Sequence, residues 1–117
     1  MIVALFALLF AGPMTAERPI VTQPAWTQRP TAEDMGLVTP DLEHPPAEVR
    51  VLMVCRITPQ GGLEACSIKS EDPPGLGYGA AVLALAPKFK MPAMDLDGRP
   101  VAGRTVQIPV LWKFRTD

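Results

Sequence analysis

The sequence predicts a small α+β domain in which a three-stranded antiparallel sheet packs against one main helix, with a short or broken helix before the sheet. Two segments, residues 49–57 and 105–114, alternate apolar side chains with other side chains at a period of two, which is typical of strands with one buried face. A Pro-Gly turn directly follows the first segment, and residues 78–86 carry apolar side chains at helical spacing. With 117 residues the chain has room for one such domain.

The first strand continues into a hairpin. Its buried face is expected to consist of Val49, Val51, Met53, Cys55 and Ile57. The residues Thr-Pro-Gln-Gly that follow match a type I turn, with Pro59 at the second position and Gly61 free to adopt a positive φ. The usual hairpin of this kind pairs the residues outside a three-residue loop, here Thr58 with Gly62.

The register of this hairpin determines where the only two cysteines lie. An uninterrupted ladder places Cys55 opposite Ala65, whereas one extra residue at positions 64–65 places it opposite Cys66 and places Met53 opposite Ile68. The bulged register brings every apolar residue of the return strand to the inner face, so burial favours it. We therefore predict a Cys55–Cys66 disulfide, the alternatives being two reduced core thiols or a redox-active pair.

Two helices and a last strand complete the expected elements. Thr31, followed three residues later by Asp34, resembles a capping box and begins a short helix that Gly36 and the prolines at 40, 45 and 46 interrupt. The main helix over residues 78–86 is stopped by Pro87. The last strand should bury Val106, Ile108, Val110, Trp112 and Phe114. Its internal Pro109 indicates a position at a sheet edge.

The N-terminal residues predict export. Residues 1–16 form an apolar run followed by small residues, as in a secretory signal peptide, and as written this hydrophobic segment is too short to cross a bilayer. If the true start lies upstream, the same segment would belong to an inner-membrane anchor. Residues 17–30 carry three prolines and are expected to be a linker or extended lead-in, which leaves residues 31–117 for the domain.

The sequence offers little support for catalysis, metals or nucleic acid. A net charge of −1 provides no basic field for nucleic acid. The lone histidine, His44, lies beside two prolines, and the carboxylates at 71–72 and at 95 and 97 fall in polar turns where such groups are normally solvated. The Gly-rich stretch at 75–80 lacks the βαβ unit that a dinucleotide site needs. The sequence therefore predicts no enzyme activity, no cofactor and no metal site. An exposed main-chain edge on the last strand, which can take up a partner peptide, is the remaining candidate for a functional site.

Four stretches together resemble the TonB C-terminal domain family, in its two-cysteine, signal-bearing form. They are "WTQRPTAED", "VLMVCRITPQGGLEACSI", "SEDPPGLGYGAAVLALAPKFKM" and "DGRPVAGRTVQIPVLW", and the likeness runs from about Trp26 to Phe114. The resemblance implies a periplasmic domain of an energy transducer that adds an extended segment of an outer-membrane receptor to its last strand and thereby serves transport. The positions matching that partner-binding strand are Thr105, Val106, Gln107, Ile108 and Val110.

The chain departs from a complete transducer in its first residues. A lead-in of 14 residues extends only about 45 Å, too short to connect an inner-membrane anchor to a receptor in the outer membrane. The expected function is therefore a periplasmic, TonB-like protein-binding domain. The alternative is a structural or dimerising envelope module of the same fold, whose edge pairs with another copy of the chain.

Overall fold

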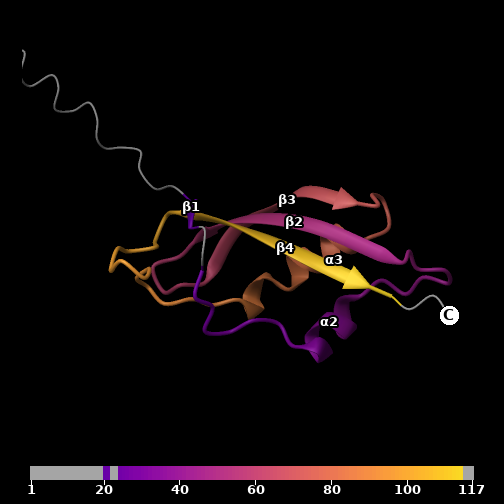
Figure 1. Ribbon diagram of the computed structural model, residues 1–117, viewed down its shortest axis with the longest axis horizontal. Helices are drawn as coiled ribbons and strands as arrows, with labels where there is room; N and C mark the ends of the chain where they lie inside the picture. The colour runs from indigo at the N-terminus through magenta and orange to yellow at the C-terminus, as the bar shows by residue number, and fades with distance from the viewer. Residues whose placement is uncertain (1–19, 22–23, 115–117) are drawn as a thin grey trace, which may run out of the picture.

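The computed structural model describes residues 20, 21 and 24–114, and it confirms an α+β architecture (Figure 1). The elements follow in the order β1 (Ile20–Val21), α2 (Ala32–Val38), β2 (Glu48–Ile57), β3 (Leu63–Asp72), α3 (Tyr78–Ala84), the 3₁₀ helix η1 (Ala86–Lys88) and β4 (Thr105–Lys113). The predicted signal peptide lies outside the described residues. Within the described part of the chain, no helix is long and apolar enough to cross a membrane.

The sheet corrects the predicted three-stranded antiparallel arrangement, because it has four strands in the order β1-β4-β2-β3 and is mixed. β2 pairs antiparallel with both β3 and β4, as expected, but β1 runs parallel to β4 on its other side. In Figure 1, β1 lies beside the beginning of β4, at the end of the sheet away from the C-terminus. The sequence pattern did not predict β1 because a strand of two residues is too short to show a period of two.

The hairpin between β2 and β3 has the predicted register. The Thr58 N–H donates to the Gly62 carbonyl at 3.0 Å, and Gly61 has a φ of +88° in the turn. One extra residue shifts the ladder between Val54 and Arg56, so that Met53 pairs with Ile68. A second shift between Leu52 and Met53 was not predicted.

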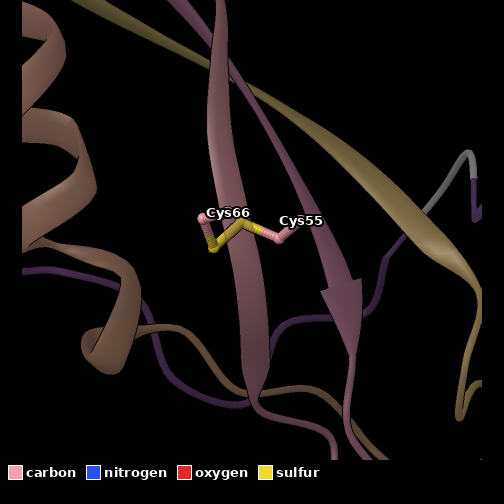
Figure 2. The surroundings of a disulfide bond; sticks show 2 residues. All are labelled: Cys55 and Cys66. Carbon is pink, nitrogen blue, oxygen red and sulfur yellow. A yellow bond between two sulfur atoms is a disulfide. The ribbon is translucent and has the colours of Figure 1, made fainter.

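The predicted disulfide is present. Cys55 on β2 and Cys66 on β3 are joined across the hairpin, with their Cα atoms 4.0 Å apart (Figure 2). The Ala65 residue of the bulge has a φ of +50°, a conformation that lets the return strand turn Cys66 toward its partner. Cys55 is only 1% exposed, so the bond is anchored in the core.

The core lies between the sheet and α3, which packs on β2 and β3. The whole predicted inner face of β2 is buried, and α3 contributes Tyr78, Ala81 and Val82. α3 ends at Ala84, and Pro87 is accommodated in η1. The loop before β4 adds Met91 and Val101, two core residues that the sequence pattern did not predict.

The short first helix begins as predicted, at a capping box in which Thr31 and Asp34 exchange hydrogen bonds of 3.1 and 2.9 Å. Gly36 does not interrupt it, contrary to expectation, because an exposed glycine weakens a helix without clashing with it. The helix ends at Val38, and Thr39 is its C-cap, directly before Pro40. The Thr39 hydroxyl accepts a hydrogen bond of 3.0 Å from the Trp112 indole, which ties the end of α2 to β4.

Candidate protein-binding edge

The backbone of β4 presents alternate residues to two different sides. The Phe114 N–H donates to Ala47 at 2.9 Å, and the Arg104 carbonyl accepts from Ile57 at 2.8 Å. Because the backbone groups of successive strand residues point to opposite neighbours, the even-numbered residues of β4 face β2. The odd-numbered residues turn their backbone groups to the opposite edge; they are Thr105, Gln107, Pro109, Leu111 and Lys113.

β1 covers only the beginning of this edge. Ile20 is paired with Thr105 and Val21 with Val106, and beyond Val106 none of the described strands pairs with this side of β4. Pro109 lies in that uncovered part, where a residue without an N–H breaks no ladder bond. The predicted edge position therefore holds for the second part of β4, and the beginning of the strand is an interior position of the sheet.

The other edge of the sheet, on β3, is less suited to pairing. β3 carries two shifts of register and its exposed positions are rich in charged and polar side chains, two features that discourage an additional strand. The described part of β4 has no bulge in its pairing with β2. The uncovered part of β4 is therefore the better strand-accepting edge.

A groove of about 500 Å³ lies along this part of β4. It is bounded by residues 24–30, by α2 and by the end of the α3–η1 segment. Polar and apolar atoms contribute about equally to its exposed surface, although most of the lining residues are apolar; they are Pro24, Trp26, Arg29, Pro30, Met35, Leu85, Phe89, Gln107, Ile108, Pro109 and Val110.

The lead-in residues form one wall of the groove because they are held in place. The Thr27 N–H donates to the Lys90 carbonyl at 2.8 Å, and the Lys90 N–H donates to the Gln28 carbonyl at 3.0 Å. The Trp26 ring packs on Phe89 with centroids 5.0 Å apart. The groove can thus receive an apolar side chain beside a strand edge. Arg29 adds one positive charge to the lining of the groove. None of the described carboxylates is within ion-pair distance of it.

The structure separates the five predicted partner-binding residues into two groups. Thr105 and Gln107 direct their backbone groups to the edge, and β1 lies against the first of them. Val106, Ile108 and Val110 face β2 with their backbone and contribute side chains to the core or the groove. Sequence reasoning assigned no binding role to Leu111, whose backbone also faces the edge, or to Trp26 and Arg29 on the opposite wall.

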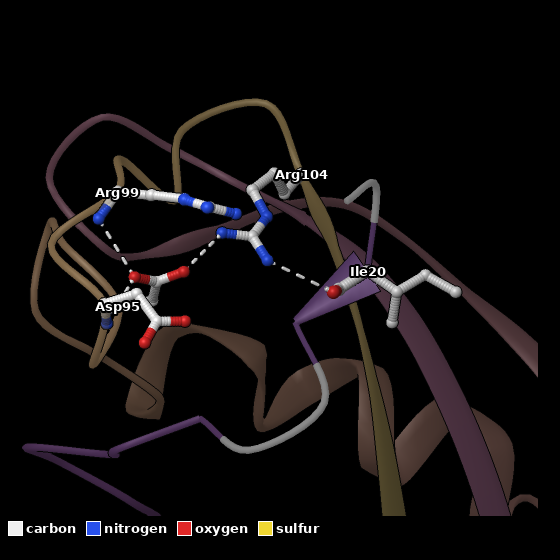
Figure 3. A network of polar contacts seen from close by, with 5 residues as sticks. Ile20, Asp95, Arg99 and Arg104 are labelled. Atoms are coloured by element: carbon white, nitrogen blue, oxygen red, sulfur yellow. Dashed lines mark hydrogen bonds and ion pairs between the residues drawn. The ribbon is translucent and has the colours of Figure 1, made fainter. Parts of the chain in front are cut away.

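A polar network lies where β1 meets β4 (Figure 3). Arg104 donates through Nη1 to the Asp95 carboxylate at 2.9 Å and through Nη2 to the Ile20 carbonyl at 3.2 Å. Asp95 also accepts from the N–H groups of Asp97 and Arg99, both at 2.9 Å. The hydrogen bond from the Arg99 N–H, followed by that from Arg104, lowers the pKa of Asp95 to about 2. Asp95 is therefore a structural anion, not the solvated turn residue that the sequence indicated.

The remaining polar candidates lie apart from this network. His44 is exposed. Among the residues that the structure describes, no group of three or more His, Cys, Asp or Glu side chains could hold a metal ion.

Comparison with known proteins gives one informative similarity. No protein-family model matches the chain. It is 32% identical over 78 residues to an uncharacterized protein of Caulobacter vibrioides, an alignment that covers 64% of this chain and 78% of the Caulobacter protein.

Proposed function

The chain belongs to the same protein family as this Caulobacter vibrioides protein, and we propose that it binds an extended segment of a partner protein by adding it as a strand to β4. The observation that carries the proposal is the uncovered edge of β4 from Gln107 onward, which lies directly beside the groove lined by Trp26 and Phe89. Main-chain hydrogen bonds would hold the partner's backbone, and the groove would receive one of its apolar side chains.

The expected affinity is modest. Leu111 offers an N–H and a carbonyl, and Gln107 and Pro109 each offer a carbonyl. The Gln107 N–H lies next to β1, because Val21 pairs with the preceding residue, Val106. Each new hydrogen bond contributes about 0.5–1.5 kcal/mol, and an apolar side chain buried in the groove contributes about 1.5–3 kcal/mol. Ordering a flexible segment opposes these gains. We therefore expect dissociation constants in the micromolar to millimolar range, which suit a reversible contact.

We further propose that the domain is TonB C-terminal-domain-like and acts in the periplasm, where it engages a segment of an outer-membrane receptor in transport. The four sequence stretches described above, the α+β architecture and the partly open last strand support this proposal. The Cys55–Cys66 bond supports an oxidising compartment, because disulfides persist mainly outside the cytosol.

The test is an NMR titration of the labelled chain with short segments of outer-membrane receptors. We expect the amide signals of the non-proline residues in the range 107–111 and the Trp26 indole signal to shift together along one binding curve. Unchanged amides at 107–111, with shifts elsewhere, would refute strand addition at this edge.

A matched pair of variants at Leu111 separates main-chain from side-chain recognition. Leu111→Pro removes an N–H that faces the edge, whereas Leu111→Ala keeps it and removes only a side chain that is 48% exposed. We expect at least a fivefold weaker affinity for the proline variant relative to the alanine variant, with similar melting temperatures. Equal affinities would show that the edge donor is not used.

The structural alternative predicts a different result. If the same edge pairs with a second copy of the chain, sedimentation would shift with protein concentration, and Leu111→Pro would weaken that self-association. A monomer at all concentrations, together with peptide binding, would favour the partner-binding function.

A further inference from the structure

We propose that β1 is a displaceable occupant of the partner-binding edge, so that the chain's own lead-in competes with the partner segment for the beginning of β4. The inference rests on the proposed function. Ile20 and Val21 lie against Thr105 and Val106, the first two residues of the strand expected to receive the partner. While β1 is in place, an added strand can pair only from Gln107 onward.

The Asp95–Arg104 pair holds β1 from outside the sheet (Figure 3). The Arg104 side chain is 17% exposed, and its guanidinium reaches the Asp95 carboxylate with one nitrogen and the Ile20 carbonyl with another. The planar fork of arginine suits such a two-sided contact. Because Asp95 is also fixed by backbone N–H groups of its own loop, this contact point persists when β1 departs.

β1 is also attached in a way that permits its release. It has only two residues, the Ile20 side chain is 42% exposed, and Val21 alone inserts into the core, at 6% exposed. Among the residues that the structure describes, the next backbone attachment after β1 is at Thr27 and Gln28, which bond to Lys90. Detaching β1 would therefore leave the wall of the groove in place.

Such an arrangement lowers the apparent affinity for any competing strand. A segment tethered by a few residues acts at an effective concentration in the millimolar range. The measured dissociation constant of a competitor equals its intrinsic value divided by the fraction of molecules with the edge open. Weakening β1 must then strengthen binding at the same edge.

The test uses the full chain and, as a probe, a synthetic peptide with the sequence of residues 17–24, which carries the β1 residues. The releasing variant is Val21→Asp, which places a charge in the apolar position that anchors β1. Ile20→Ala is the matched control because it alters the exposed neighbour. In an NMR titration we expect the peptide to bind the Val21→Asp chain at least tenfold more tightly than it binds wild type. The signals that shift should be those of residues 104–107. The Ile20→Ala chain should bind the peptide with an affinity within about threefold of wild type.

A second variant covers the case in which Val21→Asp perturbs folding. Val21→Ala keeps an apolar residue at the anchoring position but removes most of the side chain that is buried there, whereas the probe peptide keeps its own valine and all of its contacts. We expect it to raise peptide affinity about two- to fivefold with a near-native melting temperature. Equal peptide affinity in wild type, Val21→Asp and Val21→Ala would overturn the proposal.

The outcome is distinguishable from a failure of the proposed function. Tighter binding of the residue 17–24 peptide when β1 is weakened would support competition at the edge. If, in the same experiments, receptor segments shift no amide signal at 107–111 in any variant, the receptor-binding function fails while the competition stands. If receptor segments bind wild type and Val21→Asp equally, the function stands and the competition is refuted.

Discussion

The Cys55–Cys66 bond provides the sharpest test of the fold's energetics. The bond joins residues 11 apart, and closing a loop of that length lowers the entropy of the unfolded chain by an amount worth about 3 kcal/mol. For a domain of this size, 1 kcal/mol corresponds to roughly 4–8 °C in melting temperature. Reduction of the bond should therefore lower the melting temperature by roughly 12–24 °C.

The assay compares oxidised protein with protein that has been reduced in denaturant and refolded under reductant. Reduction removes no carbon or sulfur atom from the core around Cys55, so the comparison isolates the cross-link. The Cys55→Ala/Cys66→Ala chain is the control, and its melting temperature should not respond to reductant. A difference of less than about 3 °C between oxidised and reduced wild type would refute the loop-entropy reasoning.

The same bond predicts an asymmetry between two single variants. Cys55 is buried, whereas Cys66 is half-buried. A buried hydroxyl without a hydrogen-bond partner costs about 1–3 kcal/mol, so Cys55→Ser should destabilise the chain more than Cys66→Ser by roughly that amount. Urea unfolding of the two variants under reductant measures this difference, and equal stabilities would contradict the burial of Cys55.

Three further predictions concern single residues. Thr31→Ala should lower the free energy of unfolding in urea by about 1 kcal/mol because the helix loses its cap, while Thr31→Ser should stay near wild type. The ionised Asp95 carboxylate stabilises the fold at pH values above its unfolded pKa, and this stability is lost as the pH falls toward its folded pKa of about 2. The Asp95→Asn chain should therefore lose less of its free energy of unfolding than wild type between about pH 6 and pH 2, as measured by urea unfolding. Parallel pH curves for the two chains would contradict this role. Gly61→Ala should lower the free energy of unfolding by at least about 1 kcal/mol, because the turn requires a positive φ and a Cβ would overlap the Met91 carbonyl oxygen. Thermal unfolding measures this change. A stability equal to wild type would show that the turn can rearrange.

Local chemistry made much of the fold predictable. The alternation in residues 49–57 identified the buried face of β2, and the Pro-Gln-Gly turn fixed where the hairpin reverses. Burial then selected the bulged register, since only that register turns Ile68 inward together with Cys66. The second shift of register was not predictable in the same way, because the exposed end of β3 carries charged and polar residues that fit either face.

The candidate site was predictable only in part. The last strand and its proline could be assigned from their pattern, but the direction in which each backbone group points depends on which residues pair with β2. The groove depends on Trp26 and Phe89, which are 63 positions apart in the sequence and show no periodic relation. The prolines around Trp26 indicated an extended segment and gave no sign of the surface on which it lies.

The sequence by itself determined the elements whose signals are local: the cap of α2, the turn, the buried faces and the pairing of the two cysteines. The tertiary structure alone decided that the lead-in returns to cover the beginning of β4 and that Arg104 reaches a carbonyl 84 positions away. The physical reason is that two backbone groups, a single buried valine and one arginine contact are too few to produce a pattern along the chain. Their energy arises only after the sheet has brought them together.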